Sequence, residues 1–354
     1  MRFRIFAVLT LLLPLFSVAA DAQFYQPKSF GVAGENLNVF VKADLNHDGK
    51  PDAVGLSFSN SQTFVTAALG DGKGGFLKPK STQVTNLNDP GNLSVGDFNG
   101  DGFPDVVISG SDPVTGVASI GVMLGNGDGT FQGTVTYPTG NGDPFSLSVT
   151  GDFNGDGKID VALLGQSVSV LPGKGDGTFG APIITAMNLS SSRCLAAADF
   201  NKDGKLDLTV GTDVLLGNGN GTFQTPLTVP QGNCGVAIAD LNHAGIPDLI
   251  TGNSPADGQA IRVHLGDGTG KFDAGMAYHT GHTAGSVIHA ADLNGNGTTD
   301  IVVLNGSDSD FTILSNQGLG TFKIGKTYNG GPNAFNFFIA DLQPKQHEEV
   351  GFGV

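Results

Sequence analysis

The sequence contains no tryptophan, four tyrosines, and only 18 lysine and arginine residues against 33 aspartate and glutamate residues. Carbohydrate-active clefts usually stack sugars on large aromatic side chains, so the lack of Trp and Tyr disfavours a polysaccharide-active enzyme or a lectin. The formal charge of −15 argues against nucleic-acid binding, because a phosphate-binding surface needs clustered Lys and Arg. Neither G-x-S-x-G nor H-E-x-x-H occurs. We therefore expect no catalytic residues and predict that the protein is not an enzyme.

Helix-forming patterns are also scarce. Only Glu35, Glu348 and Glu349 are glutamates, and the other acidic residues are aspartates, which favour loops and caps over helix faces. No segment keeps a 3.6-residue apolar period, whereas glycine accounts for 55 of 354 residues. These features predict an all-β protein with many turns.

The N-terminus carries a predicted signal peptide. Two arginines precede the apolar stretch Ile5–Val18, and Ala20–Ala22 offers a small-x-small cleavage site. Cleavage after residues 1–22 would export a protein that is secreted, displayed on the cell surface or periplasmic. No other apolar run approaches the length of a membrane span, so we expect no stable membrane insertion, and an uncleaved anchor is the alternative.

The pattern D-x-N-x-[DN]-G-x-x-D occurs five times. Side-chain oxygens at positions 1, 3, 5 and 9 can face one centre, position 7 can offer its carbonyl, and Gly at position 6 allows the required bend. Hard oxygen ligands in this spacing predict about five structural Ca²⁺ sites. The predicted ligands are Asp44, Asn46, Asp48, Asp52, Asp97, Asn99, Asp101, Asp105, Asp152, Asn154, Asp156, Asp160, Asp199, Asn201, Asp203, Asp207, Asp292, Asn294, Asn296 and Asp300.

Two weaker copies complete a series with a period of roughly 41 to 55 residues, which is typical of propellers, solenoids and arrays. The copy that starts at Asp240 has Ala244 at position 5, and the copy that starts at Asp341 has Lys345 there. A single copy could be an ordinary turn, because Asp, Asn and Gly suit turns without any metal. The repetition in register favours ion binding.

The residues after each loop exclude an EF-hand, which needs a carboxylate at position 12 and a following helix. Position 12 is instead Gly or an aliphatic residue, and a β-branched run follows, as in Asp105–Ser109 and Asp300–Leu304. Such runs predict buried strands.

A second motif, a glycine-rich turn that ends in Phe, follows each loop and strand. Examples are Leu69–Phe76, Leu124–Phe131 and Leu216–Phe223. The first spells G-x-G-x-x-G, but no helix pattern follows, so we predict no dinucleotide site. Each unit then has four strands: one before the loop, one after it, one before the glycine-rich turn, and one that starts at the Phe. Four short antiparallel strands per repeat predict the blade of a β-propeller.

In these motifs the chain resembles the FG-GAP/VCBS repeat family and is similar to the calcium-bearing blades of the integrin α-subunit propeller. The resemblance covers nearly all of residues 23–354 and implies a single domain of seven blades, exported and usually non-catalytic. The last repeat is truncated: Asn333–Val354 offers strands one and two, Phe24 onward could add strand four, and strand three has no candidate. Six full blades plus an incomplete one is therefore the alternative, and an open edge would invite self-association.

The resemblance implies a calcium-binding adhesion module whose partner is an extracellular protein or glycan. A lectin or polysaccharide-active enzyme of the same fold, and a structural scaffold subunit, are the alternatives. Cys194 and Cys234 lie at similar places in adjacent repeats and could form one disulfide in an oxidising compartment, or remain two buried thiols.

Overall fold

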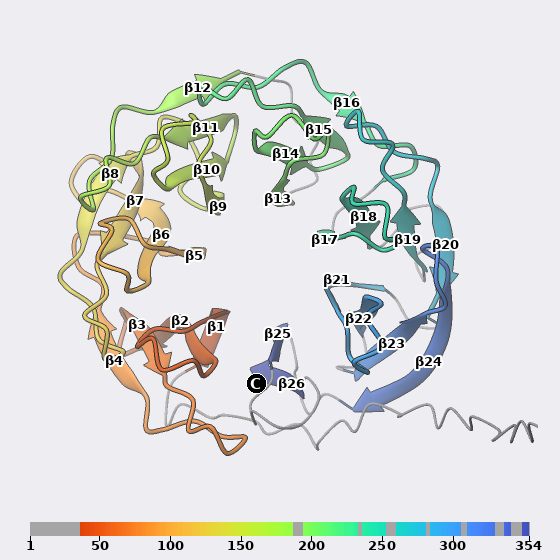
Figure 1. Ribbon diagram of the computed structural model, residues 1–354. Coiled ribbons are helices and arrows are strands. Elements are labelled where there is room, and N and C mark those ends of the chain that lie inside the picture. Colours follow the sequence, from red (N-terminus) through yellow and green to blue (C-terminus); the bar gives the residue numbers. More distant parts are fainter. Residues whose placement is uncertain are drawn as a thin grey trace, which may run out of the picture.

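The computed structural model describes residues 36–186, 194–232, 236–252, 260–280, 284–305, 310–329, 336–340 and 349–353. All 26 elements in these ranges are strands, which confirms the all-β prediction. They form six four-stranded antiparallel sheets and one two-stranded sheet. The sheets stand as blades around a common axis (Figure 1).

The strands follow chain order within each blade. Blade 1 comprises β1 (Asn36–Ala43), β2 (Asp52–Ser59), β3 (Gln62–Ala68) and β4 (Lys80–Gln83); blade 2 comprises β5 (Leu93–Gly96), β6 (Asp105–Ser111), β7 (Ala118–Met123) and β8 (Val135–Pro138); blade 3 comprises β9 (Leu147–Gly151), β10 (Asp160–Leu164), β11 (Val168–Leu171) and β12 (Ile183–Thr185). Blade 4 comprises β13 (Leu195–Ala198), β14 (Asp207–Val210), β15 (Asp213–Leu215) and β16 (Leu227–Thr228); blade 5 comprises β17 (Val236–Ala239), β18 (Asp248–Thr251), β19 (Ala260–His264) and β20 (Met276–His279); blade 6 comprises β21 (Ala284–Ala291), β22 (Asp300–Asn305), β23 (Asp310–Asn316) and β24 (Phe322–Asn329).

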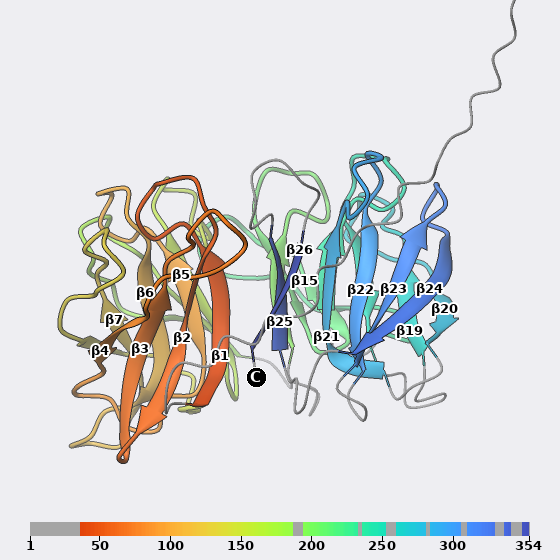
Figure 2. The same cartoon turned by 90° about the horizontal axis from the view of Figure 1, so that it is seen from below.

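The remaining sheet pairs β25 (Asn336–Ala340) with β26 (Glu349–Gly353). The first strand of each blade contacts the first strand of the next, and β25 contacts both β21 and β1, so the inner ring closes through β25. Figure 2 shows β25 and β26 between blade 6 and blade 1. Six full blades and one two-stranded sheet match the alternative expected from the sequence. The Phe24 segment proposed for the missing outer strand lies outside the described residues.

The second strand of each blade is buried on both faces because blades pack against it from either side. All seven residues of β6 are buried, as are all six of β22. The outermost strands, by contrast, are mostly exposed or half-buried, as β8 and β12 show. This gradient explains why the β-branched runs after the loops were the clearest strand signals in the sequence.

One strand prediction is wrong: the fourth strand does not generally begin at the blade Phe. Phe131 instead forms an isolated bridge with Gly125, and β8 begins at Val135. Phe76, Phe179, Phe223 and Phe272 form equivalent bridges, and only in blade 6 does the strand start at the Phe, Phe322. The Phe closes the turn with a side chain that is buried in blades 2 to 5 and half-buried in blade 1, and the outer strand starts further along the chain.

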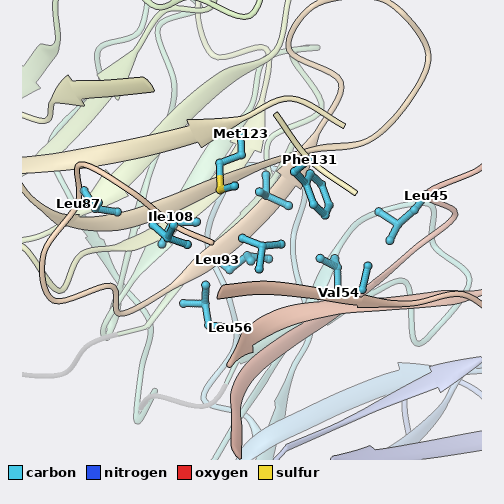
Figure 3. Packing of buried hydrophobic residues seen from close by; sticks show 12 residues of the cluster. Leu45, Val54, Leu56, Leu87, Leu93, Ile108, Met123 and Phe131 are labelled. Atoms are coloured by element: carbon cyan, nitrogen blue, oxygen red, sulfur yellow. The ribbon is translucent and has the colours of Figure 1, made fainter. Parts of the chain in front are cut away.

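The hydrophobic core is divided into clusters, most of which combine residues of two neighbouring sheets. The cluster between blades 1 and 2 includes Leu56 and Val65 from blade 1 and Ile108, Met123 and Phe131 from blade 2. Figure 3 shows Leu56, Ile108, Met123 and Phe131 of this cluster. Since each blade buries both faces only when it has neighbours, no blade is expected to fold alone.

Cys194 precedes β13 and is disulfide-bonded. No free cysteine occurs among the described residues. The only other cysteine of the chain, Cys234, lies outside them. No helix in the described ranges is long and apolar enough to cross a membrane.

Candidate metal-binding loops

The five D-x-N-x-[DN]-G-x-x-D motifs and the weaker copy at Asp240 lie between the first and second strands of blades 1 to 6. Consecutive strands run antiparallel, so all six loops lie on one face of the propeller, and this face also carries the glycine-rich turns. The copy at Asp341 is outside the described residues. Each set of predicted ligands therefore lies in a single loop, and the six loops belong to separate blades.

Every loop has the same hydrogen-bonded frame. One carboxylate oxygen at position 1 accepts the N–H of Gly at position 6, at 2.9 Å from Asp44 to Gly49 and 2.8 Å from Asp199 to Gly204. The amide oxygen at position 3 accepts the N–H of position 5, as in Asn154 with Asp156 at 2.8 Å. Such side-chain to backbone bonds hold the loop in a tight turn.

Positive φ angles at positions 4 and 6 complete the bend. Gly49 and Gly102 at position 6 have φ of 77° and 89°. Position 4 has the same sign, with φ of 73° at Gly100 and 55° at His47. Glycine adopts these angles without a steric penalty.

Position 9 has a role that the sequence pattern did not reveal. Asp105 is fully buried; its Oδ2 accepts the N–H of Phe98 at position 2, at 2.8 Å, and its Oδ1 accepts the N–H of Gly125 in the glycine-rich turn, at 2.7 Å. Asp207 and Asp248 make the same two bonds in their blades. This carboxylate therefore connects the loop to the turn even without an ion.

Burial raises the pKa of Asp105 to about 6, although the two backbone hydrogen bonds act in the opposite direction. Burial likewise raises the pKa of Asp52, Asp160, Asp207 and Asp300. A cation beside such a carboxylate favours its ionised form. The position-9 aspartates are thus the groups in the loop that would gain most from a nearby positive charge.

The donor set fits calcium in its chemistry, because the side chains at the ligand positions of the five full loops offer only carboxylate and amide oxygens. Asn99 Nδ2 lies 2.8 Å from Asp101 Oδ2, and Asn294 Nδ2 lies 3.2 Å from Asp300 Oδ2, so ligand positions are already neighbours. Each carboxylate oxygen of Asp105 accepts one backbone hydrogen bond and keeps a further lone pair.

The side chains are not, however, assembled around one point. No group of three or more His, Cys, Asp or Glu side chains in the described ranges is arranged to hold a metal. In two loops an ammonium group contacts the position-5 carboxylate: Lys50 Nζ lies 2.8 Å from Asp48, and Lys205 Nζ lies 3.4 Å from Asp203. The hydrogen bond from Lys50 lowers the pKa of Asp48.

Comparison with known proteins identifies the repeat. The model of the FG-GAP-like repeat matches residues 44–108, 152–210 and 240–303, which together exceed half of the chain. The chain belongs to the FG-GAP-like repeat family. The matched ranges begin at position 1 of loops 1, 3 and 5, so this family is defined here by the loop and the strands that surround it. No curated protein matches the chain by sequence.

Solved structures support the propeller fold of this FG-GAP repeat protein. The periplasmic gluconolactonase PpgL of Pseudomonas aeruginosa is similar, with a TM-score of 0.56 at 16% identity over 87% of this chain and 86% of that chain. BBS1N, crystallised with ARL6DN, gives a TM-score of 0.54 at 10% identity with the same coverage of both chains. At these identities the likeness concerns the fold alone.

Proposed function

We propose that this FG-GAP repeat protein is an exported, non-catalytic propeller that holds structural calcium in its loops and binds an extracellular protein or glycan. The observation that carries the proposal is the repeated loop frame. Five loops with oxygen-only ligand positions share one hydrogen-bond pattern and lie on one face. An ordinary turn needs Asp or Asn at one or two positions, whereas these loops keep four.

Each calcium would be held by positions 1, 3, 5 and 9 of one full loop, with the carbonyl of position 7 as a further donor. The bound ion would supply positive charge where several carboxylates lie close together. Lys50 and Lys205 would have to leave the position-5 carboxylates, so calcium and lysine compete in these loops. The loop at Asp240, which has Ala244 at position 5, would bind more weakly.

The calcium part is tested by thermal unfolding of the exported protein in calcium and in chelator. At one to ten times its dissociation constant, each ion adds about 0.4 to 1.4 kcal/mol to the free energy of unfolding. The Asp101→Ala variant should reduce the difference between the two conditions, and the control Asp112→Ala, on a hairpin of the other face, should not. Coincident curves for the wild-type protein would refute calcium binding.

The binding part is tested on arrays of glycans and matrix proteins, in calcium and in chelator. A saturable ligand whose binding is lost on chelation would support both parts. Binding that is equal in the two conditions would keep the binding function and remove calcium from it. Turnover of a bound ligand would contradict the non-catalytic assignment. Export itself is tested by N-terminal sequencing, which should find Gln23 first.

A further inference from the structure

A groove of about 870 Å³ lies on the face opposite the candidate metal-binding loops, between blades 1 and 2 and the β8–β9 connection. This volume is within the roughly 300 to 1,000 Å³ of small-ligand sites. Its walls are Phe58 and Ser61–Thr63 from the β2–β3 region of blade 1, the β4–β5 connection Gln83–Pro90, Pro113 from the β6–β7 hairpin of blade 2, and Phe145 from the β8–β9 connection. None of these residues belongs to a metal loop.

The β4–β5 connection is held firmly in place. The N–H of Val84 bonds to the carbonyl of Thr63 at 2.9 Å, and Asn88 exchanges two backbone hydrogen bonds of 2.8 Å with Ser111. Leu87 is buried in the core between blades 1 and 2. A Cβ at Gly110 would lie 2.6 Å from the carbonyl oxygen of Asn88, so glycine is needed for this close approach. The floor of the groove is therefore preformed.

Five polar side chains of the groove are exposed and form no hydrogen bond with the described part of the chain. Gln62, Gln83, Asn86, Asn88 and Asp89 are all exposed, and none of their side chains forms a hydrogen bond or ion pair within the described ranges. Side-chain amides carry two donors and two acceptor lone pairs each. A concave surface that offers so many unpaired donors and acceptors is suited to a polar ligand.

The equivalent connection between blades 2 and 3 shows the contrast. There Thr139, Asn141, Asp143 and Ser146 are all buried. Thr139 Oγ1 donates to Asn141 Oδ1 at 2.7 Å, and Asn141 Nδ2 donates to Ser146 Oγ at 2.7 Å. Polar residues in that connection are buried and bond to one another, whereas the polar side chains between blades 1 and 2 are exposed to solvent.

Three residues of the groove have an unusual backbone conformation. Ser61, Asn86 and Asp89 have φ of 60°, 57° and 50°, in the left-handed region that non-glycine residues seldom adopt. Three such residues line one groove. Residues in this conformation cluster at ligand sites, where the surrounding structure maintains them.

The residue types that line the groove indicate which class of ligand it fits. Among the described residues of the lining, amides and hydroxyls predominate, Asp89 is the one charged residue, and no Lys, Arg or His contributes. An anionic ligand would find no cation there. Phe145, which is 55% exposed, and Phe58 add apolar surface in a chain without Trp. The ring of Phe145 lies beside the connection, since a Cβ at Gly91 would be 3.1 Å from its Cδ1.

We infer that this groove binds a neutral oligosaccharide, whose hydroxyls pair with the amides of Gln62, Gln83 and Asn88 while a sugar face packs on Phe145. The inference rests on the proposed binding function and assigns it a site and a ligand class. An extended peptide, which also offers neutral donors and acceptors, is the competing occupant that the experiment must separate.

The test is titration calorimetry with neutral hexasaccharides of glucose, mannose, galactose and xylose, and with a neutral Ser/Gly/Asn peptide as comparison. The double variant Gln62→Ala, Asn88→Ala avoids the positive-φ positions, so its melting curve should match that of the wild type. Its affinity for the bound hexasaccharide should fall at least tenfold, and Phe145→Ala should act in the same direction. The control Gln132→Ala, Gln224→Ala changes two exposed amides on the other face and should bind normally.

The outcomes separate the two proposals. If a hexasaccharide binds the double variant and the wild type with equal affinity, the groove is not its binding site, although the proposed binding function still holds. Peptide binding that the double variant loses, without hexasaccharide binding, overturns the ligand class. If no hexasaccharide binds, the inference is wrong; if the protein and glycan arrays are also negative, the proposed function fails as well.

Discussion

The interface between blades 1 and 2 and the contact that closes the ring at β25 are built differently. The first is an apolar core that includes Leu56, Val65, Ile108 and Met123. The contact of β1 with β25 includes a hydrogen bond of 2.9 Å from Lys42 Nζ to the carbonyl of Ile339. A core of this kind resists opening through lost apolar burial, whereas a single hydrogen bond contributes only about 1 kcal/mol.

The described side chains of β25 pack against blade 6. Towards blade 6 its buried residues Phe337 and Ile339 join a cluster with Leu293 and Val302. The His289 ring on β21 meets Phe337 edge to face, with centroids 4.6 Å apart. Since the described apolar side chains of β25, Phe337 and Ile339, pack against blade 6, we expect β25 to separate from β1 before it separates from blade 6. Local opening at an element with fewer apolar contacts is common in folded proteins.

The largest expected effect comes from the core interface. Ile108→Ala should lower the free energy of unfolding by about 2 to 5 kcal/mol, because Ile108 is fully buried between two blades. Urea unfolding measures this change. The control Val114→Ala, at a side chain that is 91% exposed, should change it by less than about 0.5 kcal/mol. Similar values for the two variants would mean that the interface does not limit stability.

A smaller effect is expected at the closure. Lys42→Met keeps the apolar stem but removes the hydrogen bond to Ile339, which should cost about 0.5 to 1.5 kcal/mol locally. Hydrogen exchange should become faster at the amides of β25 and β26 and remain unchanged in blade 2. Lys80→Met, which removes an exposed pair with Asp128, is the control. Equal acceleration in all blades would show that the ring opens as one unit.

The smallest effect concerns pH. Burial, and then the charge of Lys42, lower the pKa of His289, although its hydrogen bond to the backbone of Phe337 raises it. The unfolded chain therefore binds the proton more tightly than the folded one. The stabilisation due to neutral His289 is complete above its unfolded pKa of about 6.5 and is lost as pH falls through the lower folded pKa.

Hydrogen exchange of β25 between pH 7.5 and 5 measures this loss. Protection, corrected for intrinsic exchange rates, should decrease towards acid pH in the wild-type protein and decrease less in His289→Gln. An equal decrease in both would assign the pH dependence to other groups, among them His264, whose pKa is also lowered by burial.

Much of the fold could be predicted because loop and strand patterns are local. Ile108 and Val303 lie in strands that the β-branched runs predicted, and the frame at Asp97 and Gly102 follows from residue spacing. The start of the fourth strand was wrong because the role of Phe131 depends on its bridge to Gly125 and on the path of the chain to the rim.

The candidate sites were less predictable, because they depend on contacts between distant residues. Nothing in the spacing shows that both oxygens of Asp105 accept backbone N–H groups, one of them from Gly125. The groove is built from two blades and two connections between blades, and unpaired amides such as Asn88 cannot be told from paired ones such as Asn141 by residue type. The one available signal was that the β4–β5 connection is richer in Asn and Asp than a turn requires.

The hydrogen bond between the position-9 aspartate and the glycine-rich turn is the same in different blades, whereas the length of the hairpin between the two varies. The bond spans 20 residues in blade 2, from Asp105 to Gly125, but only 10 in blade 4, from Asp207 to Gly217, at the same 2.7 Å. The intervening hairpin can therefore lengthen or shorten without disturbing the face that carries the candidate metal-binding loops. For an engineer, these hairpins are suitable insertion points for foreign peptides. A propeller of this kind could display up to six peptides on the face opposite the loops.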